Sequence, residues 1–141
     1  MIEADGFLQA PREDVWALVA EPFHLPDWWP GYRGVEPDRR GLAVNARWEV
    51  QRSASPGLLR RPGGRGLIVL TRVVEGWELR WHDVQQRLDC GVVLDNAGTG
   101  RTRAVIGVDG PWLRLILEGA RSLPGQALVR LQALCQTAAE L

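Results

Sequence analysis

The feature that most constrains this chain is a helical pattern over residues 111–141. Apolar residues recur there at steps of three and four, the period that places side chains on one face of a helix. They are Ala120, Leu123, Ala127, Leu128, Leu131, Leu134, Cys135 and Ala138. Arginine and glutamine fall mostly on the opposite side, which predicts an amphipathic helix lying on an apolar surface and not a membrane span. Pro124 lies inside the pattern, so we expect either a kink or two helical pieces meeting near residues 122–123.

The start of the chain predicts a strand followed by two short helices. Residues 2–10 are moderately apolar and are expected to form an edge strand. A helix should begin at Pro11, since proline suits a first helical turn and Glu13 and Asp14 complement the helix dipole there. Pro22 ends that helix, and Pro26 can start a single further turn.

The middle of the chain predicts strands. Alternation of apolar and polar residues, bounded by turn residues, indicates strands at 32–36, 44–52, 67–74, 77–84, 86–94 and 101–108. Residues 53–66 are rich in Pro, Gly and Ser and are expected to form a long loop, in which Leu58 and Leu59 either contact an apolar ligand or are simply flexible. The prediction is one α+β domain over residues 1–141, a curved antiparallel sheet of about six or seven strands with the long helix laid on it.

Composition excludes several classes of function. The 17 basic and 17 acidic residues balance, so no global field favours nucleic acid, and we expect no nucleic-acid partner. All the basic residues are arginine, so a lysine Schiff base is impossible. Cys90 and Cys135 lie in apolar patterns, which predicts two buried thiols and a reducing, cytoplasmic setting. Residues 1–5 lack the basic start and apolar core of a signal peptide.

Seven tryptophans are the compositional outlier. Several fall in phase on the predicted inner face of the sheet, which indicates either a bulky core or an aromatic-lined pocket facing the last helix. The pocket hypothesis predicts a small hydrophobic molecule as the partner. Its expected lining residues are Trp29, Trp48, Val50, Val69, Trp77, Leu79, Trp81, Leu88, Cys90, Ile106, Trp112, Leu128 and Leu131. The alternative is an interaction module whose interior is filled by its own side chains.

Catalytic groups are sparse. Arg52 and Asp83 share the inward phase and lie at strand ends, where an arginine could hold a carboxylate and an aspartate could take a proton. A solvated strand end or a salt bridge between the two is the simpler interpretation. His82 falls on the outer face and His24 in a loop, so we expect no metal site and no cofactor. Outward arginines alternate with acidic residues, which predicts cross-strand pairing and not a basic patch.

Four segments resemble a known family. They are Ala10-Pro11-Arg12-Glu13-Asp14-Val15-Trp16, Leu25-Pro26-Asp27-Trp28-Trp29-Pro30-Gly31, Asn96-Ala97-Gly98-Thr99-Gly100-Arg101-Thr102 and the terminal Ala138-Ala139-Glu140. Together with the order of elements, they resemble the polyketide cyclase/dehydrase and lipid-transport family of the SRPBCC superfamily, which also holds StAR-related lipid-transfer domains and birch-pollen allergens. The resemblance implies a helix-grip fold with a deep apolar cavity, used in relatives for lipids, polyketides, hormones or quinones.

Two functions are therefore expected. The first is binding of an aromatic polyketide-, quinone- or lipid-like molecule between the sheet and the last helix. The second is a polyketide cyclase or dehydratase that uses Arg52 and Asp83 at the cavity mouth. The resembling motifs are structural, a helix start, a helix stop and a hairpin turn, so they specify the fold better than the activity. Neither the ligand nor the oligomeric state follows from the sequence.

Overall fold

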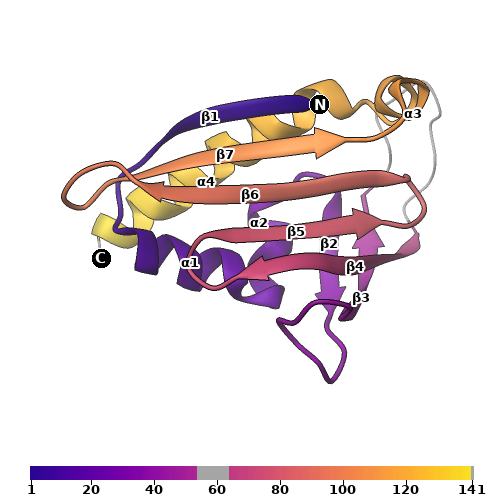
Figure 1. Ribbon diagram of the computed structural model, residues 1–141, viewed down its shortest axis with the longest axis horizontal. Helices are drawn as coiled ribbons and strands as arrows, with labels where there is room; N and C mark the ends of the chain where they lie inside the picture. The colour runs from indigo at the N-terminus through magenta and orange to yellow at the C-terminus, as the bar shows by residue number, and fades with distance from the viewer. Residues whose placement is uncertain (54–63, 141) are drawn as a thin grey trace.

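The sheet is a seven-stranded antiparallel meander. A computed structural model describes residues 1–53 and 64–140. The strands are β1 (Ile2–Leu8), β2 (Tyr32–Glu36), β3 (Arg47–Arg52), β4 (Arg65–Val74), β5 (Glu78–Asp83), β6 (Leu88–Asn96) and β7 (Thr102–Asp109). Their spatial order is β1-β7-β6-β5-β4-β3-β2, so β2 to β7 follow one another across the sheet and β1 pairs with β7 at one edge (Figure 1). The expected edge strand and antiparallel topology are confirmed.

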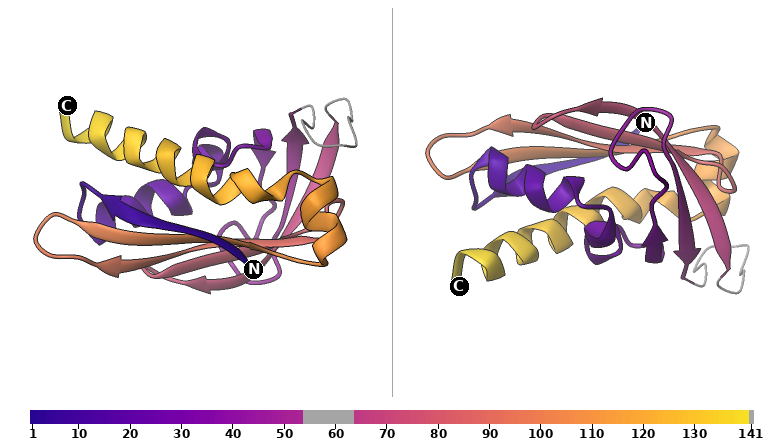
Figure 2. Two further views of the ribbon diagram at one scale, coloured as in Figure 1. Left: turned by 90° about the horizontal axis from the view of Figure 1, so that it is seen from above. Right: turned by 90° about the horizontal axis from the view of Figure 1, so that it is seen from below.

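The helices lie on one side of this sheet or at its end (Figure 2). They are α1 (Arg12–Ala20), α2 (Leu25–Trp28), α3 (Trp112–Leu117) and α4 (Leu123–Glu140), with short 3₁₀ turns η1 (Pro22–His24) and η2 (Ala120–Ser122). Figure 2 shows the sheet curving around α4, with α1 on the same side and α3 at one end. Within the described residues, no helix is long and apolar enough to cross a membrane.

The C-terminal pattern forms two helical pieces, one of the two outcomes expected. Gly119 takes a left-handed conformation with φ of 65° and ends α3, a backbone angle that glycine adopts without steric cost. Pro124 then occupies the first turn of α4, where its missing N–H breaks no hydrogen bond. The predicted apolar stripe is confirmed for most of its length, because Ala127, Leu131 and Cys135 are buried against the sheet. Its last member, Ala138, is exposed.

Two strand predictions need correction. Strand β3 begins at Arg47 and not at residue 44, because Asn45 adopts a positive φ of 72° that turns the chain. In β4 the inward residues are Ile68 and Leu70, so the prediction that Val69 faces inward is wrong. Strand β4 also starts at Arg65, inside the predicted loop. Residues 54–63 of that loop, which include Leu58 and Leu59, lie outside the described residues.

The outer face of the sheet carries ion pairs between neighbouring side chains. Arg72 and Arg80 both pair with Glu78, the first at 2.8 Å. His82 and Asp89 face each other across β5 and β6 at 2.9 Å. For Arg72 and Arg80, these contacts are the local pairing with acidic residues that the sequence predicts.

Candidate functional site

Four fully buried indoles gather between the sheet and the helices. Trp28 and Trp29 come from the end of α2, Trp48 from β3 and Trp81 from β5. The rings of Trp28, Trp29 and Trp81 meet edge to face, with centroids 5.0 to 5.9 Å apart. This geometry places the positive edge of one ring against the negative face of the next. The three rings therefore form one rigid aromatic cluster, which we call the indole cluster.

A buried carboxylate lies beside the indole cluster. Asp83, at the end of β5, is fully buried and forms an ion pair with Arg52 at the end of β3. Its Oδ2 accepts a hydrogen bond of 2.7 Å from the Tyr32 hydroxyl, and its Oδ1 accepts one of 3.0 Å from the backbone N–H of Gln86. The Tyr32 oxygen in turn accepts a hydrogen bond of 3.2 Å from Trp81 Nε1. Asp83 thus joins three strands to the aromatic core.

Burial beside this carboxylate suppresses ionisation of two other acids. Desolvation, reinforced by the charge of Asp83, raises the pKa of Tyr32 well above its ordinary value. The same two causes, in the same order, raise the pKa of the buried Cys90 thiol. Both groups therefore stay protonated at neutral pH, and Cys90 is no activated nucleophile.

These raised pKa values predict a loss of stability in alkali. The unfolded chain releases protons from cysteine near pH 8.5 and from tyrosine near pH 10, roughly, while the folded chain retains them. Stability should therefore be complete below about pH 8 and fall as the pH rises, by up to about 1.4 kcal/mol per pH unit for each group. A Cys90→Ala, Tyr32→Phe variant should show a smaller drop in melting temperature between neutral and alkaline pH than the parent. Equal drops would contradict the assignment.

Arg52 owes its position to a glycine on the next strand. A Cβ atom at Gly66 of β4 would lie 2.7 Å from Arg52 Nε and 2.9 Å from its Nη2. The guanidinium therefore occupies the space that a side chain would fill. Glycine inside a strand often marks such a close approach.

Replacing Gly66 with alanine should displace Arg52 and weaken its pairing with Asp83. We expect a loss of about 1–3 kcal/mol in the free energy of unfolding, because a buried charge loses part of its compensation. Gly64→Ala is the matched control, since a Cβ there meets no atom within 4 Å. Urea unfolding of both variants checks this, and equal stability would contradict the role of Gly66.

The polar network continues from Asp83 to α3. Gln86, whose N–H binds Asp83, donates through Nε2 to Glu118 at 3.4 Å. Glu118 is buried and also accepts a hydrogen bond of 3.2 Å from Arg114 of α3. A chain of hydrogen bonds therefore runs from the indole cluster to the helix at the end of the sheet.

Two buried donors close to this network have no hydrogen-bond partner in the described part of the chain. They are the Trp28 Nε1–H and the Arg52 Nε–H. Buried polar groups in folded proteins are nearly always paired, so each such exception requires an explanation such as a bound molecule or water. A surface hollow of about 240 Å³ also lies at the Arg52 end, lined by Arg33, Gln51, Arg52, Gly64 and Arg65.

The structure places most of the predicted lining residues together between the sheet and α4. The buried members are Trp29, Trp48, Val50, Leu79, Trp81, Leu88, Cys90, Ile106, Leu128 and Leu131. Arg52 and Asp83 form the salt bridge that the sequence offered as the simpler alternative to catalysis. Both cysteines are free and buried, as predicted.

Three predicted lining residues lie elsewhere. Val69 belongs to the outer face of β4. Trp77 precedes β5 and lies at the far end of the sheet, where the Arg12 guanidinium stacks over its ring at 3.6 Å. Trp112 is exposed on α3, because that helix is separate from α4. The prediction that these three residues line an inner pocket is wrong.

Sequence reasoning missed Trp28, Tyr32, Ile68 and Leu70 as buried members of this region. For Trp28 the sequence did hold a signal, the adjacent pair Trp28-Trp29 after Pro26. The helical turn ends at Trp28, and where a turn ends between two adjacent side chains, both can be buried. Tyr32 contacts a carboxylate 51 positions away, so no local pattern reveals its role. Residues 1–53 and 64–140 contain no group of three or more His, Cys, Asp or Glu side chains placed to hold a metal ion.

A sheet curved around one long helix, with aromatic side chains buried between them, defines the helix-grip class of α+β folds. The chain belongs to the family described as polyketide cyclase/dehydrase and lipid transport, whose model matches residues 8–99. The resemblance seen in the sequence is thereby confirmed. No protein with a curated description matches the chain.

Solved structures share this fold at low sequence identity. Protein NE0264 from Nitrosomonas europaea is 16% identical, with a TM-score of 0.71, and the match covers 99% of this chain and 96% of that one. A protein from Arthrobacter aurescens is 17% identical, with a TM-score of 0.73 and coverages of 96% and 85%. BexL, described as a di-domain ARO/CYC from the BE-7585A biosynthetic pathway, is 15% identical, with a TM-score of 0.64 and coverages of 97% and 45%. At these identities the similarity shows the fold.

Proposed function

We propose that residues 1–141 form a single ligand-binding domain that holds one small hydrophobic molecule between the sheet and α4. The observation that carries the proposal is the pair of buried, unpartnered donors, Trp28 Nε1–H and Arg52 Nε–H, beside the indole cluster. A bound molecule whose acceptor oxygen reaches either donor would satisfy it, while the indoles supply flat apolar contact. An aromatic polyketide or a quinone combines these two properties, and a lipid with a carbonyl group is a third candidate.

Quenching of tryptophan fluorescence tests the proposal. The panel contains aromatic polyketides, quinones, sterols and fatty acids, and at least one class should quench saturably because the indole cluster would contact it. Trp28→Phe keeps an aromatic ring but removes the donor, so the affinity for that class should fall about two- to tenfold. Trp112→Phe is the control, since Trp112 lies outside the cluster. The absence of saturable quenching by every class contradicts the proposal.

A polyketide cyclase or dehydratase is the second candidate, favoured by the family's description and by the structural similarity to BexL, an ARO/CYC protein. In that reaction Arg52 would hold a substrate carbonyl oxygen, Asp83 would accept a proton, and the Tyr32 hydroxyl, which donates to Asp83, would position that carboxylate. Turnover of a poly-β-ketone mimic by the parent, and its loss in Arg52→Ala, Asp83→Asn and Tyr32→Phe variants that retain their near-ultraviolet circular dichroism, would support it. Turnover that survives Arg52→Ala and Asp83→Asn together removes those residues from the mechanism.

We also propose that the domain works in the cytoplasm without a cofactor. Two free, buried thiols suit a reducing compartment. A ligand extracted from the purified protein and identified by mass spectrometry would name the molecule directly, and a copurifying redox cofactor would contradict this part of the proposal.

A further inference from the structure

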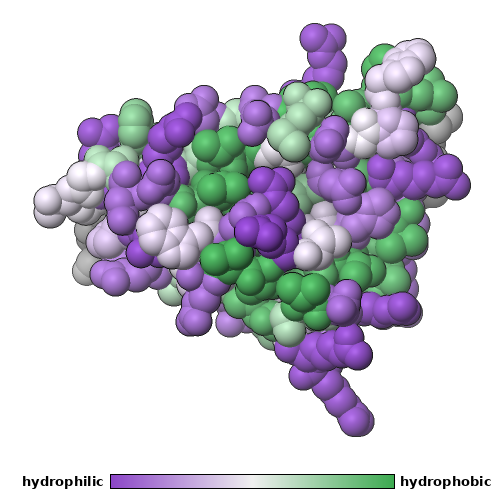
Figure 3. All heavy atoms as spheres, in the orientation of Figure 1, coloured by the Kyte–Doolittle hydropathy of each residue, from purple (hydrophilic) through white to green (hydrophobic). Residues whose placement is uncertain are grey.

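Helix α3 exposes an unusual set of apolar side chains. Trp112 is 72% exposed, Leu113 52% and Ile116 47%, and α3 contains no buried residue. Figure 3 shows hydrophobic side chains gathered over the corner of the molecule that α3 forms. Single exposed apolar residues are common, but a tryptophan and two aliphatic residues on one six-residue helix form a contiguous patch that marks an interaction surface. We call these three side chains the α3 patch.

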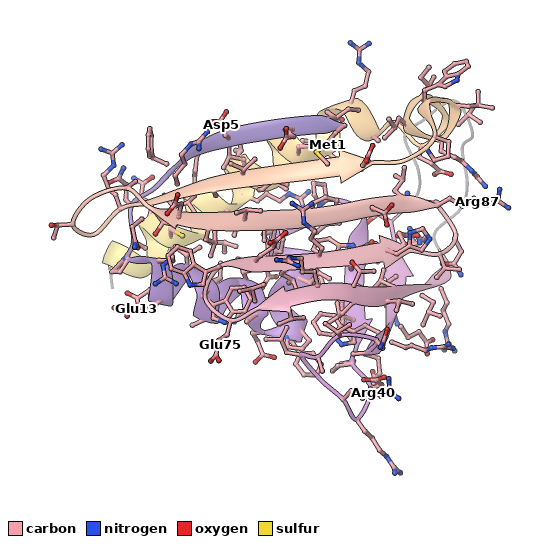
Figure 4. All side chains as sticks on the ribbon, viewed as in Figure 1. Met1, Asp5, Glu13, Arg40, Glu75 and Arg87 are labelled. Atoms are coloured by element: carbon pink, nitrogen blue, oxygen red, sulfur yellow. The ribbon has the colours of Figure 1, made fainter. Side chains whose placement is uncertain are left out.

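Two exposed arginines lie close to the α3 patch. A Cβ on Gly110, two residues before Trp112, would lie 3.0 Å from the Arg87 carbonyl oxygen, so the turn that carries Arg87 adjoins the start of α3. Figure 4 shows the Arg87 side chain extending outward at this end of the sheet. Arg121 is exposed just after α3, in η2.

The nearby carboxylates do not offset these arginines. Glu118, at the end of α3, is buried and bound to Arg114 and Gln86. Asp109, before α3, lies 3.6 Å from the N-terminal ammonium group. The patch therefore lies near two exposed arginines, Arg87 and Arg121, for which the described residues show no ion pair.

We propose that α3 docks this protein on an anionic lipid bilayer. Trp112, Leu113 and Ile116 enter the interface between headgroups and acyl chains, where tryptophan is enriched in membrane-bound proteins. Arg87 and Arg121 contact lipid phosphates, and each basic side chain near an anionic surface adds to the affinity. The charge complementarity and the chemistry of the patch together favour this occupant.

A protein partner fits the α3 patch less well. A stable protein interface buries about 800 Å² on each side. A buried tryptophan supplies about 150–250 Å², so one tryptophan and two smaller side chains fall short of that area. A lipid bilayer requires no surface of complementary shape, so a small group of apolar side chains can insert into it.

A chain of hydrogen bonds connects α3, the proposed docking helix, to the candidate site in the interior. Arg114 of α3 binds Glu118, Glu118 binds Gln86, and the Gln86 N–H binds Asp83 beside the indole cluster. Docking through α3 therefore brings the polar end of the candidate site next to the bilayer. The docking itself does not depend on which molecule occupies that site.

Sedimentation with vesicles tests the proposal on the full chain. Vesicles of equal parts phosphatidylcholine and phosphatidylglycerol should bind the protein, and pure phosphatidylcholine should bind it much more weakly. Trp112→Ser should weaken binding to the mixed vesicles at least about tenfold, because burial of the indole is lost. Phe23→Ser is the matched control, since Phe23 is an aromatic residue 64% exposed on η1, and it should bind as the parent does.

Separate variants test the contributions of the arginines and of the Trp112 indole to vesicle binding. Arg87→Gln with Arg121→Gln should reduce binding to the mixed vesicles and its dependence on salt, whereas Arg72→Gln, on the outer face of β4, should change neither. Trp112 is the most exposed tryptophan, so vesicles should shift the emission of the parent to the blue, and Trp112→Phe should remove that shift.

Three results would overturn the proposal. The first is no binding of the parent to either kind of vesicle. The second is an equal loss of binding in Trp112→Ser and Phe23→Ser. The third is a dimer of the parent that Trp112→Ser converts to a monomer, because a second copy of the chain would then cover the α3 patch.

Discussion

Asp83→Asn is expected to lower the free energy of unfolding by about 3 kcal/mol. Removing one member of a buried ion pair typically costs about 3–5 kcal/mol, because the other charge is left without compensation. The lower end of that range applies here since Arg52 retains 15% exposure and can reach water. Asparagine preserves the shape of the side chain, so the loss reports the charge. Urea unfolding followed by tryptophan fluorescence measures it.

An exposed pair on the same sheet provides the control. Asp5 and Arg103 lie 2.8 Å apart across β1 and β7, with side chains 58% and 50% exposed. Asp5→Asn should cost no more than about 1 kcal/mol, as surface ion pairs do. If the two aspartate variants lost the same stability, Asp83 would not act as a buried charge.

A double replacement separates stability from specificity. Arg52→Leu with Asp83→Leu removes both charges at once, and replacing a buried pair by apolar residues is often neutral or stabilising. We therefore expect the double variant to recover most of the stability lost in Asp83→Asn. If it recovers stability but no longer binds any ligand of the panel, the pair is retained for recognition and not for folding.

The fold was largely predictable because its strands alternate. In β3 and β5 apolar and polar residues alternate, so their inward faces followed from the sequence, Asp83 included. Strand β4 contains Leu67-Ile68-Val69-Leu70, four apolar residues in succession. Such a run does not show which of its residues face the core. The wrong assignment of Val69 follows from that ambiguity.

Two tryptophans were misplaced for a different reason. Trp77 has the same alternation phase as Leu79 and Trp81. The phase shows which face of the strand a side chain is on, but not how far along the strand the buried core extends. Trp77 lies beyond the core, where Arg12 covers its ring. Trp112 was expected to line the pocket together with Leu128, with a kink or a break between them near residues 122–123. The left-handed turn at Gly119 separates the two pieces, and a glycine within a helical pattern signals such a break only weakly.

The candidate site was less predictable than the fold because its members are distant in sequence. Tyr32 and Asp83 lie 51 positions apart, and Arg52 and Asp83 lie 31 apart. Their inward phase and strand-end positions suggested the Arg52–Asp83 pair. The hydroxyl of Tyr32 was missed, since only the bent pairing between β2 and β3, with a register shift between Tyr32 and Gly34, brings it beside them.

Trp81→Ala is expected to destabilise the protein by about 3–5 kcal/mol, the usual cost of replacing a buried tryptophan by alanine. The indole is fully buried, meets the rings of Trp28 and Trp29 at 5.9 and 5.0 Å, and donates a hydrogen bond to Tyr32. Its removal leaves a cavity that two rigid rings cannot easily fill. For a chain of this length, the loss corresponds to a fall in melting temperature of roughly 10–17 °C.

Trp112→Ala removes the same side chain from an exposed position and should change the free energy of unfolding by no more than about 0.5 kcal/mol. The contrast between these two variants is measured by urea unfolding followed by far-ultraviolet circular dichroism, which does not depend on the mutated fluorophore. Similar losses in both would mean that α3 packs on the core. A loss confined to Trp81→Ala, together with a loss of vesicle binding confined to the Trp112 variant, would show that the aromatic residues divide into an interior set and a docking set.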